Sequence, residues 1–351
     1  MENTRIGAID IAKGIGIILV IVGHALPLDN IVRVFVYTFH MPLFFILTGM
    51  VMKSPERDKT VFEDFCAEKK LIRAYGFYSL VFLLFDIIVR FTIQGDMGFK
   101  ELVWNLYQTV VFFGINVLWF LANLVLAKVL VKRICRVSVN KVYWLVAGIS
   151  LYAACCMISV HIQWLSVGRY RLVYYPLVAV LRAASSVVYI LLGYMAGGKV
   201  KQYIKKHNML TITCITLCAL ILLLCIFRFG GNVNIHVVRM GNWPIAFVCA
   251  ILGFAAVFGI SILLDRVRGI RELLCYLGTH SLFIMATHEY LKIKDVIYLC
   301  LLKLNLLNPQ NSVLLQILVL IIIECILCKL CSPYVDRIIS LNCDNSKRKL
   351  V

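Results

Sequence analysis

Residues 9–27 read IDIAKGIGIILVIVGHALP. This stretch is long and apolar enough to cross a lipid bilayer as one helix, which takes about 20 residues. Three ionisable side chains interrupt it, namely Asp10, Lys13 and His24. Because a helix turns roughly 100° per residue, Lys13 and His24 return to nearly the same face, and Asp10 lies close to that face. Charged groups inside a membrane span are costly, so these three residues are candidates for a functional site.

The whole chain shares this apolar character. Of its 351 residues, 62% are hydrophobic and only 15% are charged, which is less charge than a soluble domain carries. The apolar stretches are continuous over helix lengths and do not alternate with polar residues, so they predict helices and not the strands of a barrel. The sequence therefore predicts an all-α, polytopic helical bundle that is a multi-pass protein of the inner (plasma) membrane.

Lysine and arginine gather in short segments between the apolar stretches. Their distribution over alternate segments predicts that the N-terminus and the C-terminus are both cytoplasmic. The same clusters account for the net charge of +18, so we expect no nucleic-acid partner. We expect one integral-membrane domain over residues 1–335 and a short basic cytoplasmic tail over residues 336–351. About ten transmembrane helices are predicted, at residues 9–27, 33–52, 73–93, 115–133, 142–161, 173–197, 209–227, 243–264, 276–293 and 312–333.

A second histidine, His40, lies in the segment FHMPLFF at residues 39–45. The turn before this span is so short that the first two spans are antiparallel neighbours, which places His24 and His40 at similar depth. Two histidines could bind a metal, but no third ligand is evident, and most of the 14 cysteines lie in apolar spans without metal-ligand spacing. A catalytic histidine supported by a second polar residue is the better interpretation, with no metal. Pro42 is expected to kink the span.

Other charged residues lie at or within the predicted spans. Lys70 and Arg73 precede the third span and are three residues apart, so they share one helical face. They are interpreted either as ordinary cytoplasmic positive charge, which their spacing alone favours, or as a clamp for the phosphates of a cytoplasmic substrate. Arg182, His288 and Glu289 are intramembrane polar residues whose roles the sequence leaves open.

Several of these segments resemble the acyltransferase-3 family of integral-membrane acyltransferases, whose members acylate the hydroxyls of glycans. In that family a basic residue, usually Arg, precedes a His by eleven positions, and Lys13 and His24 match this pattern. A second basic pair, Arg-x-x-Arg, follows the second helix of the relatives, and Lys70 and Arg73 occupy that place. The resemblance is carried further by residues 39–45 with Thr48-Gly49, by LWFL at 118–121, by LGY at 192–194, and by LGTHS at 277–281 with His288.

The resemblance implies acyl transfer from a cytoplasmic acyl-CoA, in the first place acetyl-CoA, to a hydroxyl of a cell-surface glycan or of its lipid-linked precursor. His24 would be the general base, or it would carry the acyl group covalently. Lys13 would bind a coenzyme A phosphate or stabilise a developing oxyanion, and Asp10 would orient Lys13.

The resemblance also assigns the remaining candidates. His40 would support the catalytic histidine, and Lys70 and Arg73 would hold the coenzyme A phosphates. The expected partners are the sugar acceptor and membrane lipid. Two other functions stay open: a transporter or flippase for a lipid-linked glycan or small solute, and a non-catalytic member of a glycan-assembly complex. The sequence shows none of the paired broken helices that many transporters carry.

Overall fold

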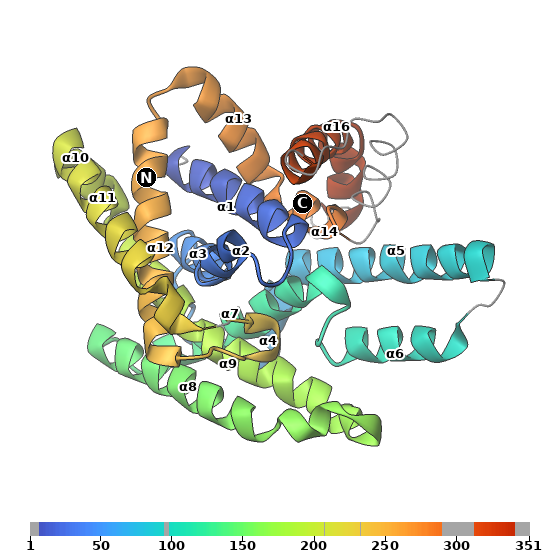
Figure 1. The fold of residues 1–351 in the computed structure, drawn as a ribbon. Coiled ribbons are helices and arrows are strands. Elements are labelled where there is room, and N and C mark those ends of the chain that lie inside the picture. Colours follow the sequence, from blue (N-terminus) through green and yellow to red (C-terminus); the bar gives the residue numbers. More distant parts are fainter. Residues whose placement is uncertain (1–6, 95–97, 207, 232, 290–311, 341–351) are drawn as a thin grey trace, which may run out of the picture. The chain divides into compact units, whose positions relative to one another are not determined.

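The computed structural model describes residues 7–94, 98–206, 208–231, 233–289 and 312–340. Within these ranges all regular elements are helices, with one isolated β-bridge between Asn234 and Arg239 and no strand. The all-α prediction is confirmed, and Figure 1 shows the helices and their connections. The predicted tail at 336–351 is partly helical because the last helix continues to Ser340, and residues 341–351 lie outside the described ranges.

The helices follow one another with short connections. The α-helices are α1 (Gly7–Ala25), α2 (Ile31–Tyr37), α3 (His40–Met50), α4 (Val61–Ala67), α5 (Lys69–Gln94), α6 (Phe99–Val110), α7 (Trp119–Val137), α8 (Lys141–His161), α9 (Arg171–Gly197), α10 (Val200–Lys206), α11 (Met209–Ile226), α12 (Trp243–Leu264), α13 (Arg268–Thr279), α14 (Ser281–Thr287) and α16 (Ser312–Ser340). The 3-10 turns are η1 (Asn116–Leu118), η2 (Gln163–Ser166), η3 (Gly168–Tyr170), η4 (Phe227–Gly230) and η5 (Ile235–Val237).

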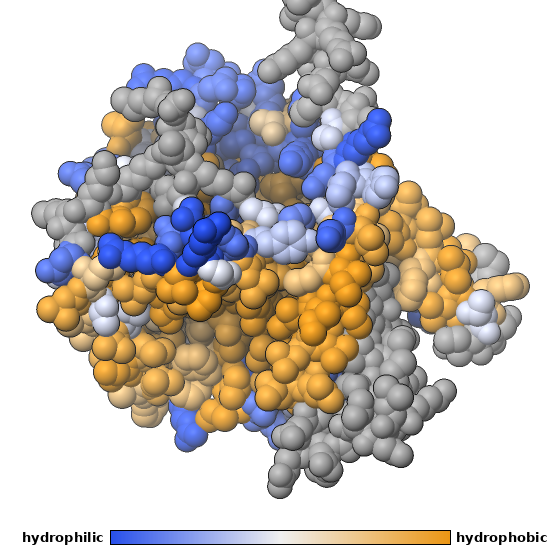
Figure 2. Space-filling view, turned by 90° about the horizontal axis from the view of Figure 1, so that it is seen from above, coloured by the Kyte–Doolittle hydropathy of each residue, from blue (hydrophilic) through white to orange (hydrophobic). Residues whose placement is uncertain are grey.

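Eight segments of the described residues are long and apolar enough to cross a membrane. The exposed side chains of these segments are largely apolar, as membrane-spanning helices require. On α16, Leu314, Leu318, Ile322, Ile326 and Leu330 are all at least half exposed and recur every four residues, which forms one apolar stripe along the helix. Figure 2 shows broad areas of exposed apolar side chains, in orange, on the face in view. Exposed apolar surface of this extent is typical of helices that face lipid, and the chain is a multi-pass membrane protein.

Two of the ten predicted spans are not among these eight segments. The predicted span 115–133 corresponds to α7, which is long enough but carries four basic residues in its second half. The predicted span 276–293 is divided into α13 and α14 at His280, and residues 290–293 lie outside the described ranges. The helix α13 begins eight residues before the predicted span, among Arg268, Arg271 and Glu272, and it ends at Thr279 with His280 as its C-cap.

The chain forms two compact units. The first consists of residues 1–58 and 127–282, and the second of residues 59–126 and 283–351. The first unit contains α1, α2 and α3 with α8 to α13, and the second contains α4 to α6 with α14 and α16.

In the first unit, glycines allow α3 and α9 to pack backbone against backbone. A Cβ atom on Gly193 of α9 would collide with the main chain of Ile46, and one on Gly197 would collide with that of Met50. In return, a Cβ atom on Gly49 of α3 would collide with the carbonyl oxygen of Ile190. Small residues four positions apart are a common device for close helix packing in membranes. The position of α3, which begins at His40, is therefore set by α9.

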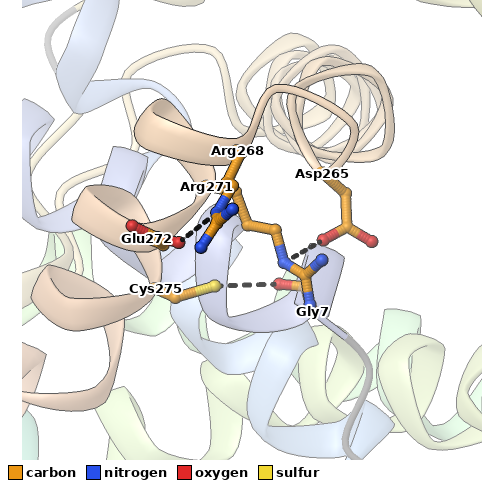
Figure 3. A network of polar contacts seen from close by, with 6 residues as sticks. All are labelled: Gly7, Asp265, Arg268, Arg271, Glu272 and Cys275. Atoms are coloured by element: carbon orange, nitrogen blue, oxygen red, sulfur yellow. Dashed lines mark hydrogen bonds and ion pairs between the residues drawn. The ribbon is translucent and has the colours of Figure 1, made fainter.

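A second glycine contact joins α1 to α13. A Cβ atom on Gly278 of α13 would meet the backbone carbonyl of Asp10, and one on Gly14 of α1 would meet that of Leu274. Figure 1 shows α13 running beside α1. At its start, α13 is fastened by the polar contacts in Figure 3: Arg271 Nε lies 3.3 Å from Asp265 Oδ1, and Cys275 Sγ lies 3.9 Å from the Gly7 carbonyl. The exposed ion pair adds little stability, so the glycine contact is the main link.

In the second unit, polar side chains of the helices find partners on their own helix or its neighbour. Asp86 of α5 pairs with Arg90 one turn later, at 3.0 Å, and its Oδ2 also accepts a hydrogen bond of 3.4 Å from the side-chain amide of Asn105 on α6. The fully buried Glu324 of α16 accepts a hydrogen bond of 2.6 Å from the hydroxyl of Thr287. These contacts offset part of the free-energy cost of placing charged side chains in an apolar bundle.

Arg182 of α9 is completely buried, as a charged residue inside a span is expected to be. Its Nη1 donates to the carbonyl oxygen of His236, at 3.2 Å, in the connection between α11 and α12. The same connection accepts a hydrogen bond of 2.7 Å from Ser159 to the carbonyl of Val238, and Arg239 bonds to Gln163 at 2.7 Å. The connection is thereby tied to α8, η2 and α9.

We expect this connection to make stability depend on pH. Burial of the ring and the neighbouring charge of Arg182 lower the pKa of His236 from 6.5 to about 3. The unfolded chain therefore binds a proton below pH 6.5 that the folded chain does not bind, and stability falls as the pH falls toward 3. The side chain of His236 keeps some contact with water, which weakens the effect of this pKa shift on stability. The expected loss of stability between pH 7 and pH 5 is therefore on the order of 1 kcal/mol. Thermal unfolding in detergent should show this loss, and His236→Asn should reduce it; an equal loss in the variant would contradict the assignment.

Candidate functional site

The second predicted span is broken just before His40. The helix α2 ends at Tyr37, where the backbone amides of Thr38 and Phe39 bond to carbonyls three residues back. Phe39 anchors the break, because its ring fills the space that a side chain on Gly253 of α12 would occupy. Pro42 lies in the first turn of α3, where a missing amide hydrogen is tolerated. The kink expected at Pro42 is therefore found three to four residues earlier.

This break fixes the orientation of His40. The side chain is 4% exposed, and its Nδ1 lies 2.9 Å from the carbonyl oxygen of Val36. Since a carbonyl oxygen can only accept a hydrogen bond, this contact assigns the proton of the neutral ring to Nδ1. His40 is thus a buried imidazole with one nitrogen already committed to the backbone.

The structure brings His24 and His40 together on the ring of Tyr37. The ring centroids of His24 and Tyr37 are 6.1 Å apart, and those of Tyr37 and His40 are 4.7 Å apart. Tyr37 can lie this close to α1 because the residue before His24 is Gly23, and a Cβ atom there would come within 2.8 Å of the Tyr37 ring. His24 itself is half-buried, in the last turn of α1. Of the two histidines, His24 is the more exposed.

A positive charge lies at the same place. The guanidinium carbon of Arg33 lies 4.7 Å from the centroid of the Tyr37 ring, which is a cation–π distance. Its Nη1 donates to the carbonyl oxygen of Leu26, at 2.8 Å, two residues beyond His24. His24 and Arg33 are both near enough to His40 to act on it electrostatically. These four side chains, His24, Arg33, Tyr37 and His40, are called the ring cluster below.

Lys13 and Asp10 lie at the other end of α1. The helix is unbroken from Gly7 to Ala25, so Lys13 and His24 are separated by about 16 Å along its axis. Asp10 is buried and Lys13 half-buried, beside the glycine contact with α13. They are therefore too far from His24 to act on the same atom of a substrate. Of the two roles expected for Lys13, the distance favours phosphate binding over stabilising an oxyanion next to His24.

Lys70 and Arg73 belong to the second unit. They lie in the first turn of α5, with Lys70 exposed and Arg73 half-buried. Their spacing places both on one side of the helix, as expected from the sequence. Their use as a phosphate-binding pair stays a prediction.

Comparison with known proteins decides the family. The family model Acyl_transf_3, described as an acyltransferase domain, matches residues 6–330. The chain belongs to this acyltransferase family. No curated protein and no solved structure matches it. The match covers both units, so this acyltransferase is one family domain whose two units are interleaved along the sequence.

Sequence reasoning missed two members of the ring cluster. Tyr37 and Arg33 stand in a segment that reads as an ordinary apolar span, and neither has a motif spacing to His24. A signal was available for Arg33, because it is an arginine within a predicted span. Tyr37 is three residues before His40, but its contact with α1 depends on the break at Thr38 and on Gly23.

Proposed function

We propose that this acyltransferase moves an acyl group, most simply acetyl, from acyl-CoA to a hydroxyl of a cell-surface glycan or its lipid-linked precursor, in the inner (plasma) membrane. The observation that carries the proposal is the difference between the two histidines of the ring cluster. His24 is accessible at the end of α1, whereas His40 is buried and bonded to Val36. An accessible imidazole supported by a buried polar partner is suited to general-base catalysis near neutral pH.

The reaction uses His24 twice. As the acceptor hydroxyl attacks the carbonyl carbon of the thioester, His24 takes the hydroxyl proton and a carbon–oxygen bond forms. The tetrahedral intermediate then collapses, the carbon–sulfur bond breaks, and the departing coenzyme A sulfur receives the proton from His24. Arg33, which lies over Tyr37 in the ring cluster, supplies a fixed positive charge for the transient oxyanion.

Lys13 has a separate role in this proposal. Acyl-CoA is an extended molecule with the thioester at one end and the phosphates toward the other, so it suits two binding groups about 16 Å apart on one helix. Lys13 binds a phosphate on the cytoplasmic side, with Asp10 one turn before it. Lys70 and Arg73 provide further positive charge for the phosphates; as a lysine, Lys70 acts as a point charge, while Arg73 can bond in a bidentate way.

The proposal is tested with inverted membrane vesicles that contain the protein. Acyl-CoA labelled in its acyl group is added outside, together with a glycan acceptor. We expect label to appear in the acceptor as an ester and coenzyme A to be released in equal amount. Cells that lack the protein give the contrary result to look for. If such cells still acylate the glycan but no longer export it, the protein is a transporter and the proposal is wrong.

Tyr37 should act as a positioning residue for His24. Tyr37→Phe keeps the ring and should leave kcat within about threefold of wild type, because the contacts with His24 and His40 are ring contacts. Tyr37→Leu removes them and should lower kcat about tenfold, since aromatic pairs contribute about 0.5–1.5 kcal/mol. The KM for acyl-CoA should not change in either variant, because the phosphates bind elsewhere. Equal losses in Phe and Leu would show that the hydroxyl, and not the ring, is needed.

A further inference from the structure

A cavity of about 370 Å³ opens in the first unit, away from the ring cluster. It lies where the ends of α3, α9 and α12 meet α10 and the beginning of α11. Its walls are apolar: Met50 ends α3, Ile212 comes from α11, and Phe254 and Phe258 come from α12. The two phenylalanine rings stack, with centroids 5.4 Å apart and an angle of 13° between their planes. This volume is within the range of sites that bind small molecules.

The inner wall of the cavity has few groups that could form hydrogen bonds with a polar ligand. The hydroxyl of Thr216 donates to the carbonyl of Ile212 within its own helix, at 2.7 Å. The remaining wall residues, apart from Lys199 and Tyr203, have hydrocarbon, thioether or no side chains. Buried polar groups of a ligand would lack partners here, which costs free energy. The chemistry of the cavity therefore selects a hydrocarbon chain.

The entrance has the opposite character. Lys199 is exposed and lines the cavity directly after α9. The sequence places three more lysines in the next seven residues, at 201, 205 and 206, which belong to α10. The charge distribution of the chain predicts that this end of α9 is cytoplasmic. Basic residues directly beside a span on that side attract anionic lipids.

We propose that this cavity is a binding site for an anionic phospholipid of the cytoplasmic leaflet. One acyl chain fills the space between Met50, Phe254 and Phe258, and the phosphate lies at Lys199. The proposal does not depend on the acyl-transfer reaction, because the cavity shares no residue with the ring cluster. It has a consequence for that site, since the bound chain contacts Met50 at the end of α3, the helix that begins at His40.

The test measures lipid binding to the purified, delipidated full chain by native mass spectrometry. Phosphatidylglycerol and phosphatidylcholine with the same oleoyl chains are titrated separately. We expect one phosphatidylglycerol to bind at about a tenfold lower concentration than phosphatidylcholine. Lys199→Glu should remove this preference, whereas Lys141→Glu, at an exposed lysine that begins α8 on the same predicted side, should keep it.

A second pair of variants tests the cavity itself. Ala255→Trp places an indole in the space, and should abolish the bound lipid of both kinds. Ala153→Trp, at a half-buried alanine of α8 outside the cavity, should retain it. Equal binding of the two lipids to wild type, an unchanged preference in Lys199→Glu, or retained lipid in Ala255→Trp would each overturn the proposal. Lys199→Glu changes an exposed side chain, so its folding is not at risk.

Discussion

Replacing His24 with alanine should lower the rate of acyl transfer by about 10²- to 10⁴-fold, which is the usual contribution of a general base. The amount of protein in the membrane should stay the same, because His24 is half-buried in the last turn of α1 and its contact with Tyr37 is a single tilted ring pair. His24→Gln should be as inactive, since an amide has similar size but cannot take a proton at neutral pH. The measurement is transfer of labelled acyl groups by vesicles with equal amounts of each variant.

His161 provides the matched control. It is an exposed histidine that ends the spanning helix α8, on the same predicted side of the membrane as His24. His161→Ala should keep the activity of wild type. Activity above half of wild type in both His24 variants would rule out His24 as the base. Loss of activity in His161→Ala as well would indicate a general effect on the outer ends of the helices.

The second large effect is expected at Gly193. Gly193→Ala adds one methyl group that collides with the backbone of Ile46, and a backbone cannot move aside as a side chain can. We expect the packing of α3 on α9 to weaken by about 1–3 kcal/mol, as in other overpacked sites. The result should be a lower temperature of thermal unfolding in detergent and less protein in the membrane.

Gly198 allows a close comparison, because it is five residues later at the end of the same helix. A Cβ atom there meets no atom within 4 Å, and its φ of −66° suits alanine. Gly198→Ala should therefore change stability by less than about 0.5 kcal/mol. Similar unfolding temperatures for the two variants would contradict the glycine-mediated contact between α3 and α9.

Much of the candidate site could be predicted from the sequence, because the helical repeat and the length of the turn between two helices are local properties of the chain. The face shared by Lys13 and His24 follows from the helical repeat, and α1 is a continuous helix as that argument requires. The approach of His24 and His40 follows from the short turn between the first two spans. Both arguments use only the geometry of one helix or of one helical hairpin.

The rest depended on contacts between distant segments. Tyr37 reaches α1 because of Gly23, and the break before His40 is held by Phe39 against Gly253 of α12. The predicted ninth span was wrong in its bounds for a similar reason. The amphipathic α13 is placed by the contact of Gly278 with the backbone of Asp10, and hydropathy alone does not reveal such a contact.

The central claim is that this acyltransferase esterifies a glycan hydroxyl with His24 as the base. Its most direct test is mass spectrometry of surface glycans from cells that have the wild-type protein, the His24→Ala variant or no copy of the chain. We expect glycans with the added mass of an acyl group, removable by mild alkali, in the wild-type cells alone. Identical glycans in the three strains, or acylated glycans in the cells with His24→Ala, would contradict it.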